Sequence, residues 1–80
     1  MLKISIEEYS KKHAECNPGM DIGLFEIMLK ETVKRKNSGV KCTICGAPIW
    51  ALGSAAGGYD RCFTCITGES DDSKDYEVYE

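Results

Sequence analysis

Four of the five cysteines occur as two Cys-x-x-Cys pairs, Cys42/Cys45 and Cys62/Cys65, with sixteen residues between the pairs. Each pair offers two sulfurs to one ion, and four thiolates suit Zn²⁺, which accepts tetrahedral soft donors at about 2.3 Å. The spacing falls within the C-x2-C-x15–20-C-x2-C pattern that is typical of zinc sites. The sequence therefore predicts one zinc ion in a closed, structural site bound by these four cysteines.

The segment from about residue 40 to residue 68 resembles the zinc-ribbon superfamily through two knuckles, Cys42-Thr43-Ile44-Cys45-Gly46 and Cys62-Phe63-Thr64-Cys65. The resemblance implies a metal-holding hairpin of two or three short antiparallel strands, and it specifies no biological role. The second knuckle departs from the first because its glycine comes later, in Ile66-Thr67-Gly68.

Two other interpretations of the four cysteines are weaker. Rubredoxin-like iron uses the same thiolates, but such sites usually carry Cys-Pro in the second knuckle, where this chain has Phe63. Redox-active Cys-x-x-Cys pairs need a thioredoxin-like βαβ setting, which this chain is too short to supply. Iron is therefore the less favoured metal.

The fifth cysteine, Cys16, follows His13 by three residues, so the two could form half of another metal site. Both share a helical face with Ile6 and Tyr9, and free cysteine is among the most buried residue types. The pattern therefore predicts that Cys16 packs between helices. His13 is the only histidine, and no catalytic set of residues is found elsewhere, so we expect no enzymatic activity.

Eighty residues make one small domain with a marginal core, so a metal staple is expected. The composition, 42% hydrophobic and 29% charged, is typical of a soluble globular protein. The chain has no apolar run of about 18 residues, and its charged start lacks the apolar segment of a signal peptide. These features predict a cytoplasmic protein, in which thiols stay reduced and available for metal.

Residues 1–38 are predicted to form a helical hairpin. Ser5 and Glu8 make an S-x-x-E capping box for the first helix, which ends at Asn17-Pro18-Gly19. The second helix begins at Pro18, capped by Asn17, or just after Asp21, and runs to about Lys36. Its apolar stripe comprises Leu24, Phe25, Ile27, Met28, Leu29, Thr32 and Val33.

Residues 39–68 are predicted to form the ribbon, with a strand over Pro48–Leu52, a turn over Gly53–Gly58 and a return strand from Tyr59. Residues 69–80 form an acidic tail with six acids and one lysine, either disordered or a short edge strand near Tyr76 and Val78. The predicted fold class is a small metal-stapled α+β domain.

The predicted partner is another protein, met through an exposed aromatic surface that includes Trp50 and Tyr59. Nucleic acid is the alternative partner, and exposed apolar residues also permit a homodimer. The nucleic-acid surface would use the basic end of the second helix and the residue before the first knuckle, namely Lys34, Arg35, Lys36 and Lys41. The ribbon argues against nucleic acid, because a phosphate-binding surface needs several cations and residues 42–68 contain one.

Overall fold

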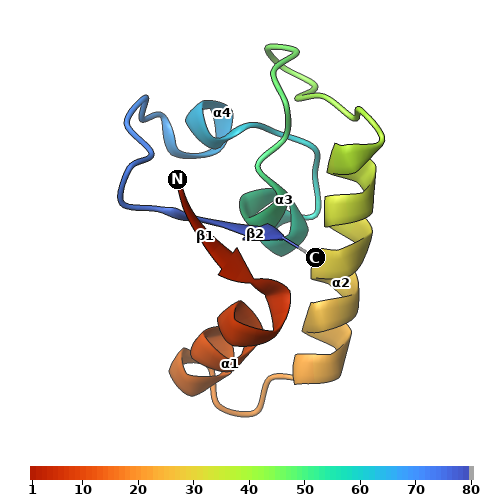
Figure 1. Ribbon diagram of the computed structural model, residues 1–80, viewed down its shortest axis with the longest axis vertical. Helices are drawn as coiled ribbons and strands as arrows, with labels where there is room; N and C mark the ends of the chain where they lie inside the picture. The colour runs from red at the N-terminus through yellow and green to blue at the C-terminus, as the bar shows by residue number, and fades with distance from the viewer. Residues whose placement is uncertain (80) are drawn as a thin grey trace.

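The computed structural model describes residues 1–79 as helices gathered around a short parallel sheet (Figure 1). The elements are β1 (Leu2–Ser5), α1 (Ile6–Cys16), α2 (Ile22–Asn37), α3 (Ala51–Gly57), α4 (Phe63–Thr67) and β2 (Tyr76–Tyr79). β1 and β2 pair in parallel, with Leu2 opposite Tyr76 and Ser5 opposite Tyr79. Part of the acidic tail is therefore an edge strand, and the chain is a small α+β domain.

α1 begins after its predicted cap residue Ser5, and α2 begins after the second of its two candidate caps. The Ser5 hydroxyl accepts a hydrogen bond from the Glu8 N–H at 3.1 Å, and the Asp21 carboxylate accepts one from the Leu24 N–H at 3.1 Å. Each contact satisfies a backbone donor that the first helical turn leaves free. Asp21, rather than Asn17, therefore caps α2.

One hydrophobic core joins both strands to α1, α2 and α3. Its buried members are Ile4, Ile6, Phe25, Leu29, Val33, Ala51, Leu52, Ala55 and Val78. The apolar stripe predicted for α2 is too wide, because Leu24, Ile27 and Met28 are exposed. α1 and α3 both pack on α2, and they leave this side of the helix uncovered. Among residues 1–79, no helix has the length and apolar character needed to cross a membrane.

The expected strand over Pro48–Leu52 and the expected turn over Gly53–Gly58 are wrong. Ala51–Gly57 is instead helical and ends at Gly58, whose φ of 74° is the left-handed conformation common after helix ends. Alanine and leucine favour helix intrinsically. Antiparallel pairing within the described residues is a single bridge between Lys41 and Pro48, so the predicted two- or three-stranded hairpin does not form.

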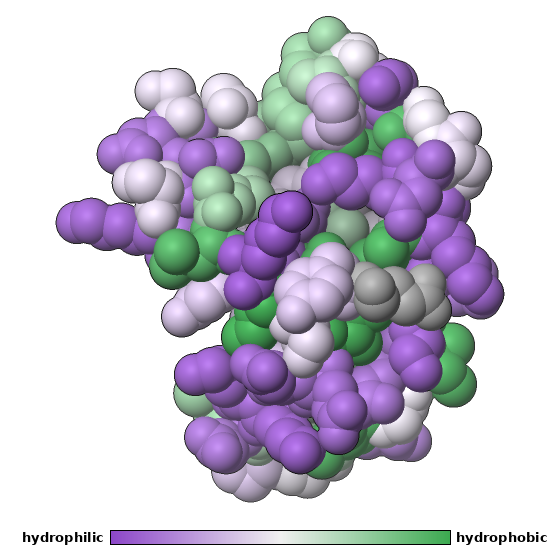
Figure 2. Space-filling view, viewed as in Figure 1, coloured by the Kyte–Doolittle hydropathy of each residue, from purple (hydrophilic) through white to green (hydrophobic). Residues whose placement is uncertain are grey.

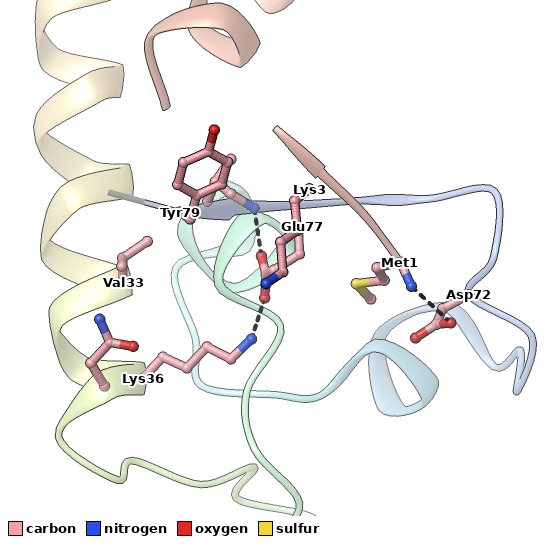
Figure 3. A pocket seen from close by; sticks show the side chains of 9 residues that line it. Met1, Lys3, Val33, Lys36, Asp72, Glu77 and Tyr79 are labelled. Carbon is pink, nitrogen blue, oxygen red and sulfur yellow. Dashed lines mark hydrogen bonds and ion pairs between the residues drawn. The ribbon is translucent and has the colours of Figure 1, made fainter. Parts of the chain in front are cut away.

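The N-terminus of α3 is capped by a residue distant in sequence. Trp50 at the cap position makes no side-chain cap bond. The Glu77 carboxylate, on β2, accepts hydrogen bonds from the Ala51 N–H at 2.8 Å and the Leu52 N–H at 3.0 Å. The same carboxylate lies 2.7 Å from the Lys36 ammonium of α2 (Figure 3). Glu77 therefore ties β2, α2 and α3 together, and no local sequence pattern predicts it.

Candidate metal centre

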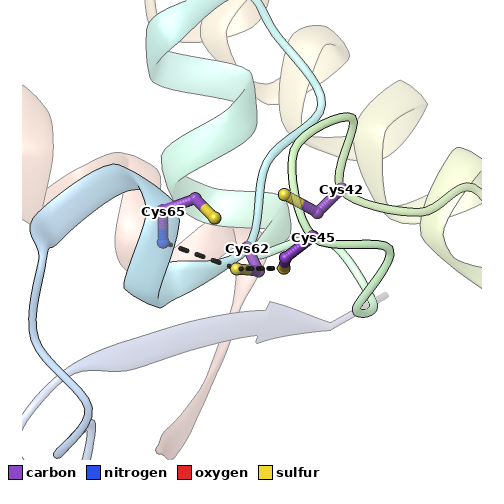
Figure 4. A group of neighbouring side chains, drawn as sticks. All are labelled: Cys42, Cys45, Cys62 and Cys65. Carbon is purple, nitrogen blue, oxygen red and sulfur yellow. Dashed lines mark hydrogen bonds between the residues drawn. The ribbon is translucent and has the colours of Figure 1, made fainter.

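The two Cys-x-x-Cys pairs converge at one point beside the core. The sulfurs of Cys42, Cys45, Cys62 and Cys65 all lie within 4.8 Å of one another (Figure 4). The Cys45 and Cys62 sulfurs are 3.4 Å apart. A tetrahedral ion with bonds of about 2.3 Å requires sulfurs about 3.8 Å apart. The four cysteines are therefore positioned to hold a metal ion.

The first knuckle is a tight turn. The Cys42 N–H donates to the Ala47 carbonyl at 2.7 Å, and the Gly46 N–H donates to the Cys42 carbonyl at 3.0 Å. Gly46 has a φ of 78°, a left-handed backbone conformation that glycine adopts freely and that residues with a side chain adopt only with strain. The Ile44 N–H points at the Cys42 sulfur at 3.4 Å, a contact that stabilises thiolate charge.

The second knuckle is the first turn of α4, which explains how it turns without an immediate glycine. Cys62 is the N-cap residue, and its sulfur accepts the Cys65 N–H at 3.4 Å. Residues three apart on a helix lie on one side, so both sulfurs face the first knuckle. Gly68, with a φ of 79°, ends the helix rather than shaping the knuckle.

Backbone contacts hold the knuckles at their separation. The Thr43 N–H donates to the Asp60 carbonyl at 3.0 Å, and the Trp50 N–H donates to the Arg61 carbonyl at 2.9 Å. The buried Ser54 hydroxyl donates to the Arg61 carbonyl and accepts the Arg61 N–H. Ser54 thus connects α3 to the residue before Cys62. The local sequence predicts a flexible turn here, so it gives no indication of this contact.

The thiols differ in acidity because their hydrogen-bond partners differ. Burial disfavours the Cys42 thiolate, yet backbone N–H donors from the knuckles lower the pKa of Cys42 to about 6. The Cys65 N–H lowers the pKa of Cys62. Contacts with the Cys62 and Cys42 sulfurs raise the pKa of Cys65 to about 12. The Ala47 N–H lowers the pKa of Cys45, but these two sulfurs outweigh it and raise that pKa overall. A dication would favour the thiolate form at all four positions.

Cys16 lies outside this cluster. It is exposed at the end of α1, so the prediction that it packs between helices is wrong. The buried residues of α1 are Ile6 and Ser10, because the core covers only the first half of the helix. The His13 ring stacks on Phe25, with ring centroids 4.4 Å apart.

The two aromatic residues predicted to meet a partner lie in different settings. Trp50 is half-buried, packs edge-on against Phe63 at 5.0 Å, and donates its indole N–H to the Tyr76 carbonyl at 2.8 Å. Tyr59 is exposed, and the Arg61 guanidinium lies over its ring at 4.8 Å. Trp50 therefore supports the fold, while Tyr59 reaches solvent.

The four cations predicted to form a nucleic-acid surface also lie in two settings, because two are paired with acids and two are free of ion pairs within the described part of the chain. Arg35 forms an ion pair with Asp60 at 3.0 Å, and Lys36 forms one with Glu77. Lys34 and Lys41 are exposed and make no ion pair within residues 1–79. Half of the predicted basic surface is thus neutralised by neighbouring acids.

The chain matches no protein-family model, no curated protein and no solved structure. The similarity to zinc ribbons therefore rests on the two cysteine knuckles.

Proposed function

We propose that this chain is a small zinc protein in which one Zn²⁺ ion has a structural role. The observation that carries the proposal is the convergence of four cysteine sulfurs within 4.8 Å. Four protein thiolates fill a tetrahedral shell and leave no open position for a substrate, which favours a structural rather than a catalytic metal. Backbone N–H groups aimed at the Cys42 and Cys62 sulfurs would orient and stabilise the ligands.

Zinc is proposed over iron because the site supplies soft thiolates in a tetrahedral set and zinc brings no redox chemistry. The Phe63 position, where rubredoxin-like sites usually have proline, points the same way. The metal would fix a segment that has little regular structure between α2 and α3.

We infer that the zinc-loaded, cytoplasmic chain acts as a protein-interaction adaptor rather than as an enzyme or a nucleic-acid binder. Arg35 and Lys36 are already paired with acids, and four thiolates with Zn²⁺ carry a net charge of −2. Ile44, between the ligands Cys42 and Cys45, exposes 61% of its surface. An exposed branched side chain on a metal-fixed loop suits a protein partner better than a phosphate backbone.

Zinc titration of metal-free, reduced chain against a chromophoric chelator tests the metal assignment. We expect one ion per chain and a parallel gain of helical circular dichroism. A fully folded chain that binds no zinc would contradict the proposal. Metal analysis of chain purified from cells grown with both metals would distinguish zinc from iron.

Fluorescence anisotropy of the zinc-loaded full chain with mixed DNA and RNA tests the alternative partner. The tail must stay, because β2 pairs with β1 and Glu77 caps α3. We expect no binding even at low salt. Micromolar binding that weakens with salt and is lost in Lys34→Glu with Lys41→Glu would instead support a nucleic-acid surface.

A further inference from the structure

The outer side of α2 exposes three large apolar side chains. The exposed fractions are 57% for Leu24, 58% for Ile27 and 40% for Met28. Their spacing of three and four residues places them along one side of the helix. Apolar atoms reach the surface along the α2 edge of the molecule in Figure 2. This side lies away from the four cysteines and belongs to no contact described above.

An open groove of about 280 Å³ lies beside these side chains, between α2 and α3. Its α2 wall comprises Ile27, Met28, Glu31, Thr32 and Arg35, and its α3 side includes Ser54 and Ala55. The side chains of α3 in the groove are small, which leaves room for larger ones from outside. Protruding apolar residues are thus adjacent to a shallow groove whose lining is mainly apolar, with Glu31 and Arg35 as its charged members.

We propose that a second copy of this chain occupies the groove, with the two α2 helices antiparallel about a two-fold axis beside Met28. Leu24 lies four residues before Met28 and Thr32 lies four residues after it, about 6 Å either way along the helix. The two-fold axis therefore places Leu24 of each copy opposite Thr32 of the other copy, where Leu24 can enter the groove. A two-fold interface of this kind requires one self-complementary surface, which this surface provides.

Charges at the two ends of α2 favour the same arrangement. Asp21 lies seven residues before Met28 and Arg35 lies seven after it, so both fall on the Met28 side of the helix. The two-fold axis brings Asp21 of each copy to Arg35 of the other. Arg35 uses its Nε and Nη2 groups toward Asp60 and keeps further N–H donors. A parallel arrangement would instead oppose like charges.

Sedimentation equilibrium of the zinc-loaded full chain over a concentration series tests this interface. We expect a reversible dimer with a dissociation constant on the order of 10 µM, because one helix pair buries a small area. Leu24→Glu should raise that constant at least about 30-fold, since it places a charge where the proposed dimer buries a leucine. Leu2→Glu, at a site 50% exposed on β1, is the matched control and should leave the constant unchanged. A chain that stays monomeric at millimolar concentration, or a dimer indifferent to Leu24→Glu, would overturn the proposal.

Asp21→Asn tests the charge pairing without removing the helix cap, because asparagine caps helices as well as aspartate. We expect dimerisation to weaken about 3- to 10-fold at low salt, and the difference to shrink at high salt. Glu26→Gln removes the same charge from the opposite side of α2 and should have no effect. Equal weakening by both variants would show that net charge, not pairing, is responsible, and would refute the proposed register. Unchanged zinc stoichiometry and circular dichroism in every variant separate this result from a failure of the metal site.

Discussion

The cysteine cluster and the Glu77 carboxylate both bring together parts of the chain that are separated in sequence, but they do so differently. The cluster joins two knuckles within one segment, residues 42–65, and none of its cysteines belongs to the main hydrophobic core. Glu77 joins three elements that are far apart in sequence and contacts the N-terminus of a core helix. With a bound metal, the cluster would be a local staple beside the core, whereas Glu77 is a long-range link between elements that build the core.

The difference lies in which free-energy term each supplies. A metal bound by four thiolates contributes binding free energy directly to folding, on the order of 10 kcal/mol. A carboxylate that caps a helix and pairs with an ammonium contributes far less, because folding only exchanges its water contacts for protein contacts. Losing the metal should therefore be more damaging than losing the Glu77 charge.

Cys42→Ser should have the largest effect. The remaining three thiolates cannot complete the tetrahedral shell, so zinc and folded structure should be lost together. Circular dichroism and zinc content of the purified variant measure both. A variant that is folded and metal-free would show that the hydrophobic core is sufficient for folding. The metal would then contribute less to stability than the comparison with Glu77 assumes.

Glu77→Gln should destabilise the zinc-loaded chain by about 2–3 kcal/mol. The amide keeps one acceptor for the α3 N–H groups, but it removes the charge that pairs with Lys36 at 2.7 Å. Urea unfolding of the zinc-loaded chain gives the change. Glu69→Gln, in the exposed part of the tail, is the control and should stay within about 0.5 kcal/mol. Equal stabilities of the two variants would show that the Glu77 charge does not stabilise the contacts among β2, α2 and α3.

Zinc affinity should rise at least about 100-fold per pH unit near pH 7. The pKa values of Cys45 and Cys65, the latter about 12, lie above their usual value, so both thiols keep protons that zinc must displace. Lower pH therefore weakens binding, and below about pH 6 the protonation of Cys42 adds to the loss. Competition titrations between pH 6.5 and 8 measure the slope, and a flat profile would contradict proton release from Cys45 and Cys65 on zinc binding.

Gly53→Ala should destabilise the fold by about 1–2 kcal/mol, although alanine favours helix. A Cβ at position 53 would collide with the Trp50 ring, which packs over α3. Gly23→Ala in α2 is the control, because its Cβ would meet only Asp21 Oδ1 at 3.5 Å. That variant should gain up to about 1 kcal/mol in urea unfolding. Stabilisation by both substitutions would mean that the Trp50 ring moves to accommodate the added Cβ at little cost in free energy.

Cys16→Ser should have the smallest effect. Cys16 is exposed and lies outside the cluster, so zinc stoichiometry should remain one ion per chain. Stability should change by less than about 0.5 kcal/mol, as is usual for surface substitutions. A stoichiometry below one would instead make Cys16 a metal ligand.

The contacts that could be predicted from sequence are those closed within a few residues. Ser5 and Asp21 cap their helices through side chains that reach three residues ahead. The Cys-x-x-Cys spacing likewise brings two sulfurs together within one turn. By contrast, Ile49 and Trp50 have strand-favouring side chains, and the small residues after them fit a turn as well as a helix. Intrinsic residue preferences therefore do not determine whether this segment is a strand and turn or a helix.

The sequence by itself determined the start of α1, limited the start of α2 to two candidate caps, and identified the four cysteines that are positioned to hold a metal ion. Only the tertiary structure decided that residues 51–57 are helical, that the tail pairs in parallel with β1, and that Leu24 and Ile27 remain exposed. The physical reason is that helix caps and cysteine knuckles are satisfied by near neighbours. The N-terminus of α3 and the edge of β1 are satisfied by Glu77 and β2, which the folded chain alone brings within reach.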